Sequence, residues 1–200
     1  MIRFFDFVLA LLGILFLWPV ALVVCILIAL ENGKPVYRQV RVGRHKKPFT
    51  LYKFRTMKVG TASVATHLSN QNDITKLGRI LRKTKIDELP QLINVLKGEM
   101  SIVGPRPNLF SQTELIHERD IRGVYEKLPG ITGLGQINGI DMSRPKVLAE
   151  LDAEMCRKLN TEYYFKYIIA TFLGNGFGDR IGGSDSRDVV LESKADSKGA

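Results

Sequence analysis

The chain has 200 residues, of which 45% are hydrophobic, and a formal net charge of +9 at pH 7. This length suits one domain with appendages rather than an array of domains. The two cysteines, Cys25 and Cys156, lie far apart in the sequence, which speaks against a fold built on disulfides.

The first predicted element is an apolar segment, residues 7–30, which carries no charged side chain. As a helix it would be about 36 Å long, at about 1.5 Å per residue, which exceeds the roughly 30 Å of a hydrocarbon core. It is too long for the apolar part of a signal peptide, and no cleavage site follows it. We therefore expect membrane association. The basic residues of 34–58, with no acid among them, place the main body in the cytoplasm by the positive-inside rule.

Pro19, which follows Trp18, divides this segment into two halves of about 18 Å each. Two geometries follow from a break at this point. The helix could span the membrane with a kink, or it could bend at Pro19 and return to the side from which it came. Hydropathy alone favours the kinked span. The side of the membrane on which Met1 lies would distinguish the two.

Alternating apolar and polar residues over 34–42 and 49–55 predict the strands of a short basic β-hairpin, with a turn between them. The hairpin is either a solvated edge or a surface for phosphates and anionic lipid headgroups. The polar residues of 59–72 predict a mobile loop, and residues 75–83 predict a short basic helix.

Asp87 and Glu88 form the most informative pair in the chain. Apolar residues from Leu89 onward follow helical spacing until Gly98, which places both acids at the N-terminal end of a helix. They could cap that helix, and acids at this position usually do. Alternatively, cations close in sequence would keep them ionised, as a nucleophile or a metal ligand requires.

Two loops and a helix follow. Prolines on both sides of Arg106 restrict the loop of residues 104–107 and pre-order the guanidinium. Residues 129–139 form a glycine-rich loop, which either approaches a ligand closely or makes tight turns. Residues 157–172 read as one helix with many aromatic side chains, which suits the membrane interface or the core. The polar residues after 174 predict disorder.

Together these motifs resemble a known family. They are the apolar segment with its central proline, Lys-Phe-Arg-Thr-Met at 53–57, Asp-Glu-Leu-Pro-Gln-Leu at 87–92, Gly-Pro-Arg-Pro at 104–107 and Pro-Gly-Ile-Thr-Gly-Leu at 129–134. In this order they are similar to the bacterial sugar transferases, specifically the small monotopic polyprenyl-phosphate phosphoglycosyl transferases. The resemblance runs from about residue 3 to about residue 172.

The resemblance implies an α+β fold that is mostly helical. Residues 1–31 would form a re-entrant helix-hairpin anchor that breaks at Trp18 and Pro19, which reverses the preference drawn from hydropathy. Residues 32–173 would form a small catalytic domain with a short β-hairpin and amphipathic helices at the interface, and residues 174–200 a disordered tail. The protein would lie on the cytoplasmic face of the bacterial inner membrane, in contact with anionic lipids.

The resemblance also implies a reaction. A phospho-sugar passes from a UDP-sugar to undecaprenyl phosphate with release of UMP, which begins the assembly of a membrane glycoconjugate. Asp87 would attack the β-phosphate and form a covalent intermediate, and Asp87 and Glu88 would hold Mg²⁺. Phosphate binding would fall to Arg106, Arg82, Arg55 and Lys53, and the nucleotide loop would comprise Gly130, Thr132, Gly133, Gln136 and Asn138.

Two positions depart from the family pattern. Trp18 stands where several members have a serine, so the bend would be held differently. Ile140 stands where many have an arginine, so that another cation such as Arg144 must bind the nucleotide or its affinity falls. Two rival hypotheses remain. One is a membrane-anchored basic protein that binds acidic lipid or nucleic acid without catalysis, although the aromatic spacing of a base-stacking surface is missing. The other is direct attack by the lipid phosphate on the UDP-sugar.

Overall fold

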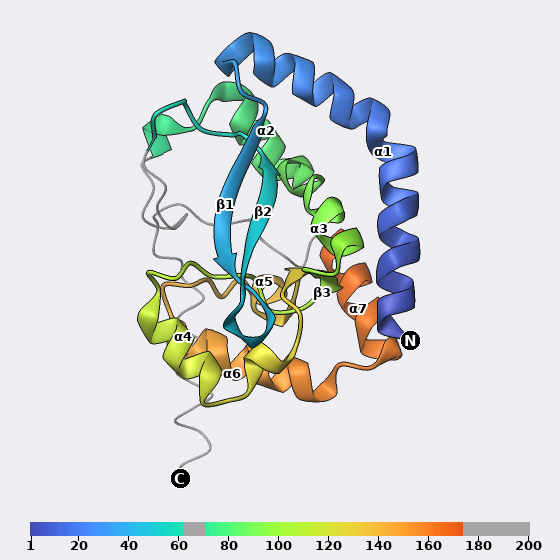
Figure 1. Cartoon of the computed structure of the whole chain (residues 1–200), viewed down its shortest axis with the longest axis vertical. Helices are drawn as coiled ribbons and strands as arrows, with labels where there is room; N and C mark the ends of the chain where they lie inside the picture. The colour runs from blue at the N-terminus through green and yellow to red at the C-terminus, as the bar shows by residue number, and fades with distance from the viewer. Residues whose placement is uncertain (62–70, 174–200) are drawn as a thin grey trace.

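The computed structural model describes residues 1–61 and 71–173, and it is mostly helical with two small sheets (Figure 1). The predicted tail and most of the predicted loop at 59–72 lie outside the described residues. The α+β class is confirmed. The elements in chain order are α1 (Ile2–Asn32), β1 (Val36–Val42), η1 (Arg44–Lys46), β2 (Pro48–Phe54), η3 (Gln71–Asp73), α2 (Lys76–Thr84), η4 (Ile86–Glu88), α3 (Gln91–Lys97), β3 (Ser101–Val103), α4 (Thr113–Asp120), η5 (Val124–Glu126), β4 (Gly130–Thr132), α5 (Leu134–Ile137), α6 (Pro145–Lys158) and α7 (Thr161–Phe172).

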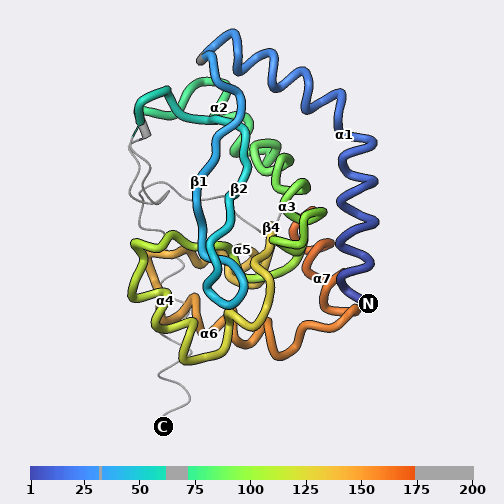
Figure 2. The backbone as a smooth tube through the Cα atoms, in the orientation of Figure 1, coloured from blue at the N-terminus to red at the C-terminus, as the bar shows by residue number. Residues whose placement is uncertain are grey.

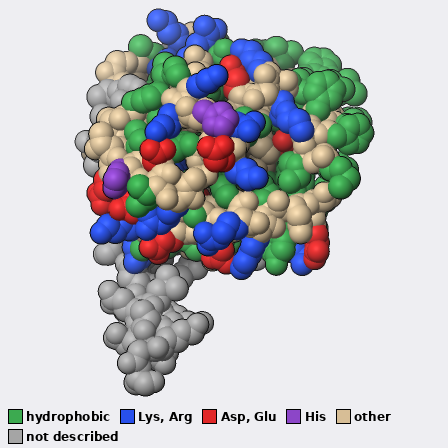
Figure 3. Space-filling model, turned by 60° about the horizontal axis from the view of Figure 1, so that its bottom comes forward, with side chains coloured by type: hydrophobic (Ala, Val, Ile, Leu, Met, Phe, Trp, Pro, Cys, Tyr) green, Lys and Arg blue, Asp and Glu red, His purple; other side chains and the backbone are tan. Residues whose placement is uncertain are grey.

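Helix α1 is one continuous helix that contains Pro19, and it changes direction part of the way along (Figure 1). By length and composition it could cross a membrane, and only 11% of its most apolar stretch is buried. Its outer face exposes large apolar side chains, which Figure 3 shows as the hydrophobic flank of the molecule. The predicted apolar helix and its bend are therefore present, whereas two separate halves that form a hairpin are not seen.

The N-terminal half of α1 is fastened to the domain by charged side chains. Asp6 is only 1% exposed, and its Oδ1 accepts hydrogen bonds from the Ser101 hydroxyl at 2.8 Å and the Tyr164 hydroxyl at 2.9 Å. Arg3 forms an ion pair with Asp6 at 3.6 Å and donates to the carbonyl oxygen of Val95 at 2.6 Å. The beginning of α1 is thus tied to α3, β3 and α7.

The C-terminal half of α1 packs on a different part of the same domain. Val24 and Ile28 are buried in a cluster with Phe54 of β2 and Leu81 of α2. The tube in Figure 2 shows α1 passing over the top of the molecule before the chain enters β1. Both ends of α1 therefore contact one domain, while the outer face between them stays exposed.

The predicted basic hairpin is confirmed. Strands β1 and β2 pair antiparallel with a register from Val36↔Phe54 to Val42↔Pro48. Its turn contains His45 and Lys46 at positive φ, an uncommon conformation for residues with a Cβ. Phe49 and Leu51 on β2 point into a core cluster with Val95 and Met100.

Strands β3 and β4 form a parallel pair. Near this pair, close contact between backbones explains why three positions are glycine. A Cβ added to Gly130 would lie 2.0 Å from the Gly104 nitrogen, and one added to Gly133 would lie 2.4 Å from the Gly104 carbonyl oxygen. A Cβ added to Gly104 would lie 2.5 Å from the Leu128 carbonyl oxygen. These glycines let two chain segments touch, as small residues do wherever backbones approach closely.

The prediction of one helix over residues 157–172 is wrong. Helix α6 ends at Lys158, and Asn160 adopts an extended backbone and accepts a hydrogen bond from the Tyr163 N–H, which begins α7. An asparagine in this role is a strong start signal, and the aromatic run concealed it. Tyr164 and Tyr167 of α7 are buried in the core, whereas its end exposes Ile169, Phe172 and Leu173. Helix α7 thus has both a core face and an exposed apolar end.

Candidate active site

The Asp87–Glu88 pair lies in η4, a single 3-10 turn between α2 and α3. The turn forms because Lys85 ends α2 with a left-handed backbone at φ 58. Ile86 and Leu89, on either side of the pair, pack against the cluster that contains Val24 and Ile28 of α1. The pair therefore lies directly before the N-terminal end of α3, close to where the sequence predicts it, but no side-chain cap is seen at η4 or α3. The acids are held by apolar neighbours instead.

Glu88 meets Arg106 from the proline-flanked loop. The Arg106 Nη2 donates to the Glu88 Oε1 at 2.8 Å, and the two side chains are 18% and 12% exposed. The rigid loop therefore presents its guanidinium to the acidic pair, as the prolines predict. A charge-assisted pair with this little exposure is screened much less than one on the surface.

Asp87 is 8% exposed and sits among charges of both signs. Burial, followed by the nearby Glu88 carboxylate, raises its pKa from the ordinary 3.8 to about 6, although the cations Lys53, Arg106 and Arg82 act in the opposite direction. The expectation that these cations would dominate is therefore corrected, because the cost of removing the carboxylate from water is larger. At neutral pH the carboxylate form still prevails, which a nucleophile requires.

Three predicted phosphate-binding cations converge on this site, and a fourth lies elsewhere. The charges of Lys53, Arg82 and Arg106 all act on Asp87. Arg82 is oriented by a hydrogen bond from its Nε to the Thr56 hydroxyl at 2.9 Å. Arg55 instead donates to the Lys34 carbonyl at 3.0 Å and lies over the Tyr37 ring. A phosphate role for Arg55 stays a prediction.

The predicted nucleotide loop is built into β4 and α5. Gly130 and Gly133 serve the backbone contact with Gly104, which gives them a reason apart from any ligand. The polar side chains of this loop form hydrogen bonds with neighbouring protein groups. The Thr132 and Thr171 hydroxyls are 2.6 Å apart, Gln136 donates to the Ile131 carbonyl at 2.9 Å, and Asn138 donates to the Leu134 carbonyl at 2.8 Å. Whether the loop also binds a nucleotide stays a prediction.

The acidic pair fits the ligand chemistry of Mg²⁺. Within residues 1–61 and 71–173, no group of three His, Cys, Asp or Glu side chains could hold a metal by itself. Mg²⁺ is typically bound by one or two carboxylates together with substrate phosphates and water. Asp87 and the Glu88 oxygen not bonded to Arg106 could supply those two carboxylates.

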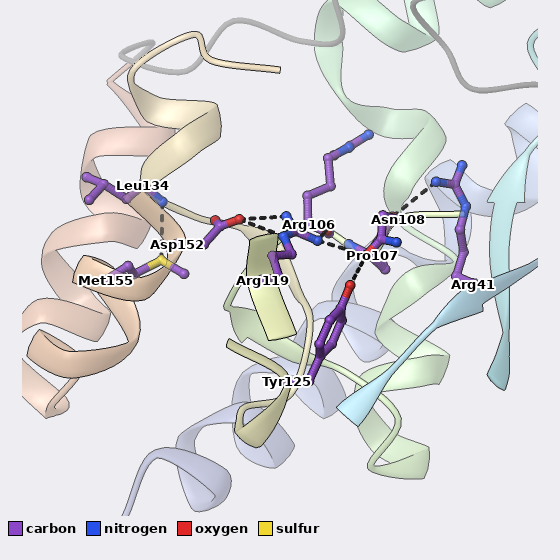
Figure 4. Close-up of polar contacts among 9 residues, drawn as sticks. All are labelled: Arg41, Arg106, Pro107, Asn108, Arg119, Tyr125, Leu134, Asp152 and Met155. Atoms are coloured by element: carbon purple, nitrogen blue, oxygen red, sulfur yellow. Dashed lines mark hydrogen bonds and ion pairs between the residues drawn. The ribbon is translucent and has the colours of Figure 1, made fainter. Parts of the chain in front are cut away.

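Sequence reasoning missed the network behind Arg106, which Figure 4 shows. Arg119 of α4 is 1% exposed and donates through Nε and Nη2 to the Asp152 Oδ2, at 2.9 and 2.6 Å. Its Nη1 donates to the Arg106 carbonyl at 2.9 Å and to the Asn108 Oδ1 at 3.0 Å. Arg119 and Asp152 are 33 residues apart, so no local pattern could have paired them. Asp6 was missed for the same reason.

Comparison with known proteins agrees with this geometry. The family model described as bacterial sugar transferase matches residues 1–175. An uncharacterized sugar transferase, EpsL, of Bacillus subtilis is 48% identical over 143 residues, which cover 68% of each chain. The UDP-glucose:undecaprenyl-phosphate glucose-1-phosphate transferase of Escherichia coli is 39% identical over 178 residues, covering 83% of this chain and 38% of the relative.

The galactosyl transferase CpsE of Streptococcus agalactiae is 40% identical over 150 residues, covering 68% of this chain and 33% of the relative. The chain thus spans about two thirds of the Bacillus relative but only 38% and 33% of the other two. The family match extends over most of the chain, from the membrane helix through η4 and the Arg106 loop to the end of α7. The chain therefore belongs to the bacterial sugar transferase family.

Proposed function

We propose that this protein transfers a sugar 1-phosphate from a UDP-sugar to undecaprenyl phosphate and releases UMP. The observation that carries the proposal is the buried Asp87 beside the Glu88–Arg106 ion pair, in a turn packed directly on α1. An ionisable nucleophile, cations for a diphosphate and a membrane helix meet within this one cluster. The E. coli relative is named for this reaction, a UDP-glucose:undecaprenyl-phosphate glucose-1-phosphate transferase, and the S. agalactiae relative is named a galactosyl transferase.

In the proposed first step, an Asp87 carboxylate oxygen forms a bond to the β-phosphorus of the UDP-sugar. The bond between that phosphorus and the bridging oxygen breaks, and the electron pair leaves with UMP. In the second step a phosphate oxygen of undecaprenyl phosphate forms a bond to the same phosphorus. The bond to Asp87 then breaks, which regenerates the carboxylate and leaves a lipid diphosphate sugar.

The cations near Asp87 would make this attack feasible. A carboxylate approaching a diphosphate meets strong repulsion, and positive groups fixed in advance reduce it in the transition state. Lys53 of β2, Arg82 of α2 and Arg106 of the proline-flanked loop would share this role, which is supported by the action of all three charges on Asp87. Mg²⁺, held by Asp87 and Glu88, would neutralise further diphosphate charge when bound.

The same arrangement suggests how the enzyme meets its lipid substrate. We infer that α1 enters the cytoplasmic leaflet of the inner membrane and returns, because both its ends contact one domain and its outer face exposes apolar side chains. The basic hairpin would then face anionic headgroups, which attract Lys and Arg near the surface. Asp87 would then lie at the level of the lipid phosphate.

The proposal is tested by incubating the purified protein with Mg²⁺ and a UDP-sugar labelled in the sugar, without lipid acceptor. We expect label on Asp87 and one equivalent of UMP, and then transfer of the label when undecaprenyl phosphate is added. UMP release only after the lipid is added, with no labelled protein, would favour direct attack by the lipid phosphate. No UMP release with any UDP-sugar would favour a basic binding protein. A panel of UDP-sugars also identifies the substrate, since the named relatives differ between glucose and galactose.

A further inference from the structure

We propose that the buried Arg119–Asp152 pair positions Arg106 for the reaction, by fixing the backbone from which the Arg106 side chain extends. This inference rests on the proposed function, because the effect it predicts is on sugar-phosphate transfer. The loop of residues 104–108 is called the Arg106 loop below. Arg119 touches the loop and not the acidic pair, so its role is one of positioning.

The backbone of the Arg106 loop is fastened at four consecutive carbonyl groups. The Gly130 N–H donates to the Pro105 carbonyl at 2.9 Å, and the Val42 N–H donates to the Asn108 carbonyl at 2.9 Å. Side chains hold the two carbonyls between them. Arg119 donates to the Arg106 carbonyl at 2.9 Å, and Arg41 donates to the Pro107 carbonyl at 3.0 Å. The backbone on both sides of Arg106 is thus held by hydrogen bonds, and the ion pair with Glu88 orients its side chain.

The Asn108 side chain ties the same network to a second element. Its Oδ1 accepts from the Arg119 Nη1 at 3.0 Å and from the Tyr125 hydroxyl at 2.9 Å. Asn108 itself is completely buried. Figure 4 shows Arg119, Asn108 and Tyr125 gathered on one side of the loop, while the Arg106 side chain leaves on the other. The network therefore supports Arg106 from behind, and its guanidinium reaches Glu88 in front.

Stability alone does not account for a buried pair of this kind. Removing two charges from water costs several kcal/mol, and replacement by apolar side chains of similar size is often neutral or stabilising. Arg119 and Asp152 are each 1% exposed, so this cost applies to both. What an apolar pair could not do is donate to the Arg106 carbonyl and Asn108. We infer that this donation, rather than stability, is the function of the pair.

The test is a double-mutant cycle. The paired variant Arg119→Met with Asp152→Leu removes both buried charges together, and Arg106→Ala removes the side chain that they are proposed to position. We expect the paired variant to lower kcat/KM for UMP release by about 10- to 100-fold when Arg106 is present, since small misplacements of a catalytic cation cost this much. We expect less than about a twofold further loss when Arg106 is already absent. The unfolding temperature of the paired variant is measured alongside, because the Arg106 carbonyl loses a donor while the cost of burying the two charges disappears.

The control removes a neighbouring ion pair. Arg122→Met with Glu118→Leu removes the pair between Glu118 of α4 and Arg122, which follows that helix and bonds to Glu118 and Glu150 instead of the Arg106 loop. It should leave kcat/KM within about twofold. If the paired variant does not fold, Tyr125→Phe removes one hydrogen bond from the same network. It should lower kcat/KM several-fold when Arg106 is present and leave it unchanged in the Arg106→Ala background.

Two results would overturn the inference. One is an unchanged kcat/KM in the paired variant, provided that it folds. If the paired variant does not fold, an unchanged kcat/KM in Tyr125→Phe overturns the inference instead. The other is an equal fractional loss with and without Arg106, which would show that the pair acts independently of that side chain. Both require an active parent enzyme. A parent that releases no UMP from any UDP-sugar would instead refute the proposed function, so the two failures are distinguishable.

Discussion

Arg106 and Glu88, eighteen residues apart in the chain, meet at 2.8 Å with both side chains largely buried. The ion pair connects the rigid loop to the turn that carries Asp87. Each charge reduces the cost of burying the other, so the pair is stable before any substrate arrives. In the proposed reaction, an incoming diphosphate would meet an oriented cation beside the nucleophile.

We expect Arg106→Ala to lower both activity and stability. It leaves the Glu88 carboxylate buried without its cation, and because both groups retain some exposure we expect a loss of about 1–3 kcal/mol in the free energy of unfolding. The value of kcat/KM should fall about 100-fold or more, because a cation that stabilises the transition state is lost. Arg106→Lys keeps the charge but lacks the planar fork, so its kcat/KM and its stability should lie between those of the parent and of Arg106→Ala.

Kinetic assays and denaturant unfolding in detergent measure both quantities for Arg106→Ala. The control is Lys166→Ala, which breaks an exposed pair with Glu162 on α7 and should change stability by less than about 1 kcal/mol. Equal effects of the two alanine variants would contradict the assignment of Arg106 to the site.

Asp87→Asn should abolish turnover and stabilise the protein at neutral pH. In the absence of Mg²⁺, burial and Glu88 raise the pKa of the Asp87 carboxyl to about 6, so its ionised form costs folding free energy above that pH. A shift of about two units corresponds to a gain on the order of 2–3 kcal/mol for a neutral replacement.

The sign of the pH dependence checks this prediction. As the pH falls from about 6 toward 4, the wild-type carboxyl takes up a proton in the folded state and loses its penalty. The advantage of Asp87→Asn should therefore shrink over this range. Thermal unfolding at pH 7.5 and pH 4.5 in EDTA measures it. A variant less stable than the parent at pH 7.5 would show that the carboxylate has stabilising partners in the folded protein.

Local patterns in the sequence predicted the local features of the fold. Alternation located the hairpin, hydropathy located α1, and the two prolines predicted the rigid presentation of Arg106. Features that depend on distant residues could not be predicted in this way. Nothing in the sequence near Asp6 indicates that it is buried, yet the distant Ser101 and Tyr164 hydroxyls donate hydrogen bonds to it in the folded chain.

The error at α7 and the raised pKa of Asp87 have different causes. Asn160 separates two helices through one backbone turn, and a run of helix-forming residues on both sides hides a single capping residue. The charges near Asp87 were visible in the sequence, but its burial was not. Burial depends on Ile86 and Leu89 packing against α1, which is a tertiary contact.

Gly130→Ala should destabilise the protein strongly. The added Cβ would lie 2.0 Å from the Gly104 nitrogen and 2.5 Å from its Cα, and backbone atoms cannot move aside as a flexible side chain would. We expect a loss of about 2–4 kcal/mol in unfolding free energy, or failure to fold.

Gln136→Ala is the matched comparison for Gly130→Ala, because it removes a polar side chain of the same predicted nucleotide loop without a clash. It loses one hydrogen bond to the Ile131 carbonyl, worth about 1 kcal/mol. If Gln136 binds the nucleotide, Gln136→Ala should raise KM for the UDP-sugar. Gly130→Ala should instead lower the free energy of unfolding. Gly130→Ala with normal stability and a raised KM would instead assign the glycine to the ligand.

The course of α1 gives the last prediction. If the helix returns to the side it entered, its two ends are both cytoplasmic, and their contacts with one domain can exist together only in that case. Asp6 must reach Ser101, and Ile28 must reach the cluster around Phe54. A straight span would have to abandon one of these contacts and expose a buried carboxylate or an apolar cluster.

In a Cys25→Ala background, a single cysteine inserted directly after Met1 or substituted at Lys34 should be labelled equally by a membrane-impermeant maleimide in inverted vesicles, and neither should be labelled in intact spheroplasts. Cys156 is largely buried, and its thiol pKa is raised to about 12 by burial, so it should contribute little background. Opposite labelling of the two positions would establish a single span. Pro19→Ala should shift labelling toward that pattern, because it restores the helix hydrogen bond that the proline removes and so favours a straighter helix.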